Sequence, residues 1–199
     1  MNTSTVTRFT TGIRHSMLAL AILGAGASHS LAQDDHSHMD AMKRDPSNNA
    51  SAFLKIVRDS TERFKDVHVA MAEGYVLQFG CVSGSDSGAM GLHYVNGKLV
   101  EGGVLDPTRP QIVIYEPMPD GSLKLIGADY LVLAQTWHAK HAETPEMMGQ
   151  LFHLFEAPNR FGLPAFYTLH VWAWKDNPKG AFVNWHPNVS CESFAGQKR

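Results

Sequence analysis

Three histidines lie in the middle of short apolar segments, where an imidazole ring has few neighbours that can hydrogen-bond to it. They are His93 in GLHYV, His153 in LFHLF and His170 in TLHVW. Each ring nitrogen that is buried without a partner costs free energy, and one metal ion would satisfy several imidazoles at once. The pattern therefore predicts a metal site whose ligands are these three histidines.

Two carboxylates occupy similar positions. Asp129 interrupts the apolar segment 125–132, and Glu116 ends the apolar segment 112–116. Buried carboxylates are normally paired, hydrogen-bonded or bound to metal, so both are candidate ligands, orienting groups or general bases. Three imidazoles, or two with a carboxylate, leave an open position on zinc, copper or iron for water or substrate. We therefore predict a metal-binding protein with Glu116 and Asp129 as candidate catalytic residues, and the pattern does not decide whether it is an enzyme.

Other interpretations of the same residues stay open. Each histidine alone also suits a hydrogen-bonded core residue, because the spacing between the three is too long and irregular to form a motif. Glu116 precedes a proline and also suits an exposed strand end. A second hypothesis is a non-enzymatic secreted module that binds a small apolar ligand in an aromatic pocket. The candidate aromatic residues are Phe161, Phe166, Tyr167, Trp172, Trp174, Phe182 and Trp185.

A helix and several strands must position these side chains. Apolar residues recur at helical spacing from Phe53 to Met71, with Asp45-Pro46 before them and Gly74 after them, which predicts one long amphipathic helix. Beyond Gly74, short runs rich in β-branched and aromatic residues alternate with Gly, Pro, Asp and Asn, which predicts strands. The expected strands are 75–82, 90–95, 111–116, 123–133, 151–155 and 166–174.

These elements indicate one α+β domain. Asp120-Gly121 is a hairpin signal, so the strands on either side of it are expected to pair antiparallel. We predict a long N-terminal helix packed on a mainly antiparallel β-sheet over residues 50–199, because no second composition regime and no repeat follows.

The first residues predict export. Arg8 and Arg14 precede an apolar run, 17–27, that is too short to span a bilayer, and Ser30-Leu31-Ala32 suits a signal peptidase. We therefore expect a signal peptide over 1–32, followed by a flexible leader rich in His, Met and Asp over 33–49. The alternative is an N-terminal anchor that is never cut.

The two cysteines point to the same compartment. Cys81 and Cys191 both follow the predicted cleavage site, so in an oxidising environment they are expected to form one disulfide, with metal ligation as the alternative. We predict a periplasmic or secreted protein without stable membrane insertion after cleavage. A net charge of -2 leaves no basic footprint for nucleic acid. A small-molecule ligand is the partner class that remains, and oligomeric state is not determined.

Several segments resemble a family of exported bacterial proteins that are usually called hypothetical. They are Cys81-Val82, 90–96, 105–110, 115–117 and 166–191. The resemblance covers most of the domain after the predicted cleavage site. It implies export and a single-domain architecture, and it implies no activity and no catalytic residue.

Overall fold

The computed structural model describes residues 46–84 and 86–198. The predicted signal peptide and the leader as far as residue 45 lie outside the described residues. The end of the predicted leader, 46–49, is the beginning of helix α2, Pro46–Thr61. No helix within the described ranges is long and apolar enough to cross a bilayer.

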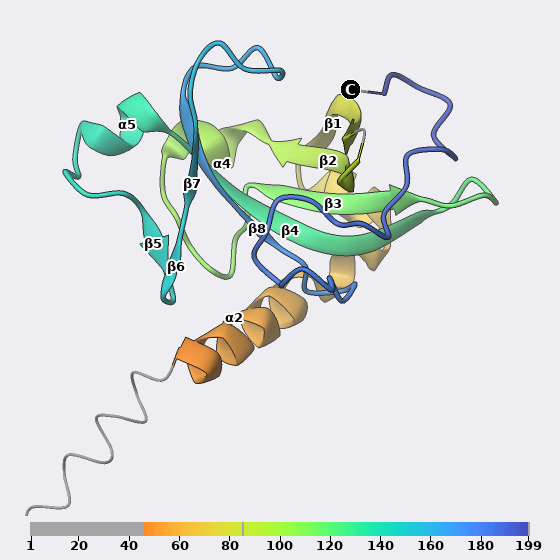
Figure 1. Ribbon diagram of the computed structural model, residues 1–199, viewed down its shortest axis with the longest axis horizontal. Coiled ribbons are helices and arrows are strands. Elements are labelled where there is room, and N and C mark those ends of the chain that lie inside the picture. The colour runs from red at the N-terminus through yellow and green to blue at the C-terminus, as the bar shows by residue number, and fades with distance from the viewer. Residues whose placement is uncertain (1–45, 85, 199) are drawn as a thin grey trace, which may run out of the picture. The chain divides into compact units, whose positions relative to one another are not determined.

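Six strands form one sheet in the order β1-β2-β3-β4-β8-β7, and every neighbouring pair is antiparallel (Figure 1). Their central members β3 and β4 are almost entirely buried, since apolar side chains occupy both of their faces. The α+β class with an antiparallel sheet is therefore confirmed. The strands are β1 Tyr75–Gly84, β2 Gly88–Asn96, β3 Ile112–Pro117, β4 Leu123–Leu133, β7 His153–Phe155 and β8 Phe166–Val171.

The turn between β3 and β4 lies at the predicted hairpin. Gly121 has φ 84°, a left-handed conformation that glycine adopts without steric cost. The Asp120 carboxylate accepts hydrogen bonds from the Ser122 amide and hydroxyl, at 2.9 and 2.6 Å. Side-chain to backbone bonding of this kind stabilises the turn that pairs β3 with β4.

Shorter elements complete the described part of the chain. Helix α4 spans Gly97–Gly102 and α5 spans Ala134–His138. Strands β5, Glu146–Met147, and β6, Gln150–Leu151, form a separate small hairpin.

The prediction of one long helix is wrong. Helix α2 ends at Thr61, a 3₁₀ helix η1 covers Glu62–Lys65, and α3 covers Val67–Ala72. Asp66 interrupts the helix because its backbone is extended and its side chain accepts a hydrogen bond from the His68 amide, which makes it a helix N-cap. The Phe64 carbonyl is then available to accept a hydrogen bond from the hydroxyl of Tyr115 on β3, at 2.6 Å.

Different segments cover the two faces of the sheet. On one face, Tyr130 of β4 packs against Phe53 of α2, with ring centroids 5.6 Å apart. On the other face, side chains from the loop between β7 and β8, Phe161 and Leu163, lie beside Asp129 of β4. The candidate site residues on this second face are therefore covered by a loop rather than by a helix.

Cys81 of β1 and Cys191 form the predicted disulfide, with a Cα–Cα distance of 5.7 Å and a sequence separation of 110. It attaches the C-terminal segment to the edge of the sheet, where the Cys81 amide also donates to the Gln197 carbonyl at 2.9 Å. Closing a loop of this length contributes about 4 to 5 kcal/mol in the chain-entropy account. The bond is consistent with an extracellular or otherwise oxidising compartment.

Candidate metal centre

The register of the sheet brings three predicted site residues to one face. His170 on β8 lies directly opposite Asp129 on β4. Asp129 lies opposite Ile112 on β3, and Ile114, two residues further along, lies opposite His93 on β2. Directly opposite residues and residues two apart share a face of a sheet. The side chains of His93, Asp129 and His170 therefore project to the same side, from three separate strands.

The distances within this group suit a metal ion. One ligand atom from each of the three side chains lies within 4.8 Å of the other two. His93 Nε2 is 3.3 Å from His170 Nε2, and His170 Nδ1 is 3.7 Å from Asp129 Oδ1. Two nitrogens bound to one tetrahedral zinc ion at about 2.0 to 2.1 Å lie about 3.3 to 3.4 Å apart. The two imidazoles have this spacing, which also suits a hydrogen bond between them.

The backbone of β2 orients His93. Its Nδ1 lies 3.2 Å from the Gly91 carbonyl, which can only accept, so Nδ1 carries the hydrogen and Nε2 presents a lone pair. Metal-binding histidines usually donate their other N–H to a carbonyl or carboxylate in this way. Gly91 is required here because its φ is 90° and a Cβ would lie 2.6 Å from the Tyr115 carbonyl oxygen.

Neighbouring groups on β8 hold the Asp129 carboxylate. Its Oδ1 accepts hydrogen bonds from the Thr168 hydroxyl at 2.5 Å and from the Leu169 amide at 3.1 Å. Burial raises the pKa of Asp129 to about 6, against the opposing effect of the Thr168 hydrogen bond. Asp129 is thus mostly ionised at neutral pH, although its exposed fraction is only 2%.

The two histidines do not neutralise this carboxylate. Burial lowers the pKa of His93 to about 4 and that of His170 to about 3, so both rings are uncharged at neutral pH. Among the described residues, His170 is the salt-bridge partner of Asp129, and it carries no charge there. A buried carboxylate without a cation is costly, and neutral imidazoles are the form that binds metals.

His170 supplies the clearest sign of a missing partner. Its Nδ1 is buried and, within 46–84 and 86–198, it is the one buried side-chain nitrogen or oxygen with no hydrogen bond. An unsatisfied buried polar group costs about 1 to 3 kcal/mol. An ion bound to the Nε2 atoms of both rings would leave the ring hydrogen of His170 on Nδ1, which faces Asp129 Oδ1 at 3.7 Å, so the set of two imidazoles and one carboxylate fits a cation.

Two predicted site residues are not in this group. His153 on β7 is exposed, and its Nδ1 lies 3.1 Å from the Asn184 side-chain oxygen. Glu116 accepts hydrogen bonds from Lys175 Nζ at 2.6 Å and from the Ser190 amide at 3.3 Å. The structure thus brings Asp129 together with two of the three histidines, while Glu116 fixes the C-terminal segment to β3.

The sequence prediction missed Thr168 and Gly91. Thr168 precedes His170 by two residues on the same strand, so strict alternation indicates that both side chains share a face. A glycine two residues before a buried histidine was the available signal for Gly91. Neither signal is specific without the register of the neighbouring strands.

The aromatic residues considered for a ligand pocket do not form a single pocket. Phe161 and Phe166 line a small cavity beside the three site residues, with a volume of about 20 Å³. Tyr167 lies in the core on the α2 side, and Phe182 stacks on Phe53 with centroids 5.7 Å apart. The Trp172 indole donates to the Val183 carbonyl at 2.6 Å, as part of the packed C-terminal segment.

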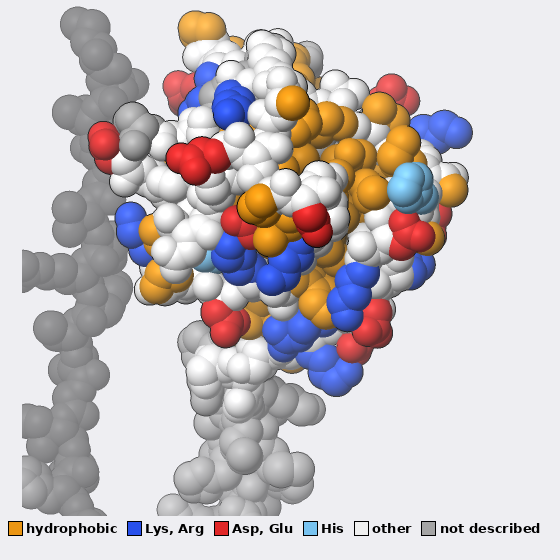
Figure 2. All heavy atoms as spheres, turned by 90° about the vertical axis from the view of Figure 1, so that its right-hand side faces the viewer, with side chains coloured by type: hydrophobic (Ala, Val, Ile, Leu, Met, Phe, Trp, Pro, Cys, Tyr) orange, Lys and Arg blue, Asp and Glu red, His pale blue; other side chains and the backbone are white. Residues whose placement is uncertain are grey.

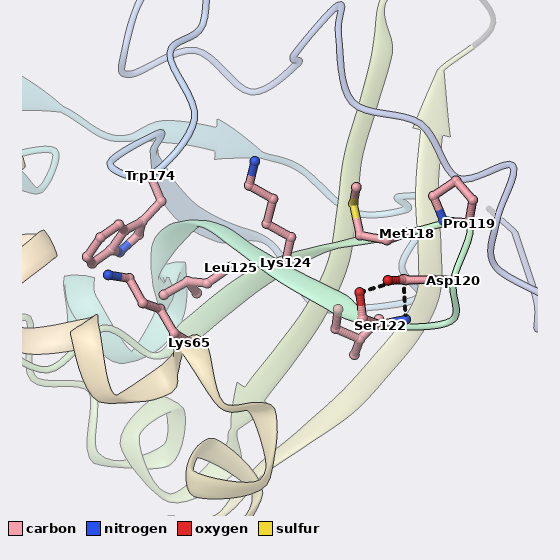
Figure 3. Close-up of a pocket in the computed structure, with 9 residues that line it drawn as sticks. Lys65, Met118, Pro119, Asp120, Ser122, Lys124, Leu125 and Trp174 are labelled. Carbon is pink, nitrogen blue, oxygen red and sulfur yellow. Dashed lines mark hydrogen bonds between the residues drawn. The ribbon is translucent and has the colours of Figure 1, made fainter.

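A more open hollow lies elsewhere, beside the turn between β3 and β4 (Figure 3). It has a volume of about 630 Å³, and Lys65 Nζ lies 4.2 Å from the centre of the Trp174 ring that lines it. The face of the molecule seen in Figure 2 carries a band of hydrophobic side chains with Lys and Arg beside it. The hollow is open and the Lys65 side chain is 53% exposed, so it indicates no specific ligand.

Compared with known proteins, the chain matches no family model, no curated protein and no solved structure.

Proposed function

We propose that this is an exported metal-binding protein in which His93, Asp129 and His170 hold one divalent transition-metal ion. The observation that carries the proposal is the buried His170 Nδ1, which has no hydrogen bond to any described residue, next to a buried carboxylate with no charged partner in that same part of the chain. A divalent cation would neutralise the Asp129 carboxylate and bind imidazoles that burial keeps unprotonated.

Zinc and non-haem iron(II) suit this donor set best. Both ions accept two imidazoles and one carboxylate, and both then keep at least one coordination position for water or another ligand. Copper also accepts imidazole, and metal analysis separates the three. The proposal uses Asp129 as a ligand, and Glu116 is occupied by Lys175, so no general base and no reaction are assigned.

Export is part of the proposal. Its support is the N-terminal sequence pattern, together with a disulfide that suits an oxidising compartment. The resemblance to exported bacterial proteins favours the same location. In such a compartment the site would acquire its metal after translocation or carry it through export.

Metal analysis of the protein tests the proposal. The chain should be expressed with its own N-terminal sequence, purified without a polyhistidine tag, stripped with chelator and titrated with cobalt(II), zinc or iron(II). We expect one ion per chain, a cobalt absorption spectrum in the visible range and a rise in melting temperature, because a ligand that binds only the folded state stabilises it.

The control variant is His153→Ala. It removes an exposed histidine of β7 that lies outside the group of three proposed ligands. His153→Ala is expected to bind cobalt(II) like the wild type, whereas His93→Ala is expected not to. A metal-free preparation whose melting temperature does not respond to any of the three ions would refute the proposal.

A further inference from the structure

A small cavity touches all three proposed ligands. Apart from His93, Asp129, His170 and Thr168, its walls consist of apolar side chains. Its volume is about 20 Å³. This is only slightly more than the roughly 10 to 15 Å³ that a cavity needs to hold one water molecule. The apolar members are Phe79, Met90, Ile112, Leu131, Phe155, Phe161, Leu163 and Phe166.

Aromatic side chains separate this cavity from solvent. Phe79, Phe155 and Phe161 are each partly exposed, whereas the proposed ligands are 2% to 4% exposed. The Phe161 ring contacts the other two, with centroid distances of 5.4 Å to Phe79 and 6.0 Å to Phe155. The partly exposed members of the cavity wall are thus these three phenylalanines and Leu163, which lie between solvent and the buried members.

The position of Phe79 depends on an unusual backbone. Its φ is 65°, a left-handed conformation that a residue with a bulky side chain adopts only at a steric cost. It lies in an irregular step of β1, where Gln78 pairs with His93 and Cys81 pairs with the adjacent Leu92. Bulges of this kind redirect a side chain out of the regular alternation and often lie next to functional sites.

The surrounding structure holds this bulge in place. Gly80, with φ 68°, lies so close to the C-terminal segment that a Cβ would be 2.0 Å from the Gln197 carbonyl oxygen. The disulfide at Cys81 follows directly. Phe79 is therefore fixed against Phe161 by contacts outside the cavity itself.

From these walls we infer that the metal centre receives an uncharged molecule of about the size of dioxygen, and that Phe79 and Phe161 exclude larger molecules. This inference rests on the proposed metal function. An anion would lose its hydration in an apolar passage at a cost of several kcal/mol. Apolar walls also favour a nonpolar diatomic molecule over water, since water requires polar partners in a cavity.

Two probes of different size test this inference on the cobalt(II)-loaded protein. Nitric oxide, an uncharged diatomic molecule, is added without oxygen, and imidazole represents a larger neutral ligand. We expect nitric oxide to change the cobalt absorption spectrum of the wild type, and imidazole to leave it unchanged at millimolar concentration. In Phe161→Ala and Phe79→Ala, imidazole should bind with an apparent Kd at least tenfold lower than in the wild type.

Phe182→Ala is the matched control, because Phe182 stacks on Phe53 at the α2 side of the sheet. It should exclude imidazole as the wild type does. Leu163→Ala widens the same wall with a smaller change, and it replaces Phe161→Ala if circular dichroism shows that this variant is unfolded.

The outcomes separate the inference from the proposed function. Failure to bind cobalt(II), zinc and iron(II) alike overturns the metal proposal and the inference with it. Cobalt(II) binding with imidazole bound to the wild type, or with nitric oxide excluded, overturns only the inference. If the folded Phe79, Phe161 and Leu163 variants still exclude imidazole, these side chains are not the ones that limit the size of the ligand.

Discussion

His93 Nε2 and His170 Nε2 lie 3.3 Å apart, although 77 residues separate the two histidines in the chain. Strands β3 and β4 lie between β2 and β8, and the two side chains meet above them. Because His93 Nδ1 donates to the Gly91 carbonyl, the hydrogen between the rings belongs to His170 Nε2 in the metal-free state. His170 Nδ1 then presents a lone pair toward the Asp129 carboxylate, which explains why it has no hydrogen bond.

Removing either imidazole is expected to abolish tight metal binding. We predict that His170→Ala and His93→Ala each lower the affinity for zinc at least about 100-fold, since loss of merely orienting groups around a metal costs about 10- to 100-fold. Competition with a chromogenic chelator measures the affinity. His153→Ala should remain within about threefold of the wild type, and equal losses in all three variants would contradict the assignment.

Asp129→Asn is expected to have opposite effects on the metal-free and metal-bound protein. The amide keeps the acceptor for Thr168 and removes a buried charge that has no cationic partner. The metal-free variant should therefore be more stable at pH 7.5, by about 1 to 3 kcal/mol, since each pKa unit of the raised Asp129 pKa corresponds to about 1.4 kcal/mol. Its affinity for zinc should fall at least tenfold.

Urea denaturation of the chelator-treated Asp129→Asn protein measures the stability change. A variant that is less stable without metal, and that binds zinc as the wild type does, would show that Asp129 is a structural residue and not a ligand.

Thr168→Val tests whether the orientation of Asp129 matters. Valine has nearly the same shape and removes the hydroxyl that donates to Asp129 Oδ1 at 2.5 Å. We expect a 10- to 100-fold lower zinc affinity, roughly the effect of removing an orienting hydrogen bond around a metal ligand. Isothermal titration measures it, and an unchanged affinity would show that the Leu169 amide alone orients the carboxylate.

The stability of the metal-free protein should fall as the pH falls below 6.5. Burial lowers the folded-state pKa values of His93 and His170 to about 4 and 3, below the ordinary histidine value of 6.5, so between pH 6 and 4 the unfolded chain binds more protons at both rings. Asp129 has a raised folded-state pKa of about 6, so the folded chain binds one more proton. Because the two histidines outweigh the one carboxylate, the unfolded chain binds more protons and the stability falls with falling pH, by about 1 kcal/mol per pH unit.

Comparing the wild type with His170→Asn separates the contribution of His170 to this pH dependence from that of the other titrating groups. In His170→Asn the slope of unfolding free energy against pH should be smaller by about 1.4 kcal/mol per pH unit between pH 6 and 4. Urea denaturation at several pH values gives both slopes. Identical slopes would show that His170 is protonated in the folded protein.

Glu116→Ala is expected to affect stability and not metal binding. Glu116 accepts hydrogen bonds from Lys175 and from the Ser190 amide, and its side chain is 11% exposed. Its loss should cost about 1 to 3 kcal/mol, the range for a buried group that loses its charged partner. Thermal unfolding measures this change in stability. If Glu116→Ala altered the cobalt(II) spectrum, Glu116 would have to be counted among the residues of the metal centre.

The sequence by itself determined most of the local elements and the pairing of the two cysteines. Alternation and turn residues predicted the positions of β1 to β4 and the hairpin at Asp120-Gly121, because these signals depend only on neighbouring residues. Two cysteines allow only one intramolecular pairing. The apolar periodicity gave a wrong prediction at Asp66, where it continues although the helix is interrupted. The interruption is recognised only when the hydrogen bond from Tyr115 on β3 to the Phe64 carbonyl is known.

The tertiary structure alone decided which side chains meet. Asp129, His93 and His170 share a face because three successive registers, β2 with β3, β3 with β4 and β4 with β8, are all fixed. A shift of one residue in any of them would move a ligand to the opposite face, since side chains alternate along a strand. His153 had the same apolar surroundings in the sequence, but its strand lies at the exposed edge of the sheet, so solvent and Asn184 satisfy its ring and no buried partner is needed.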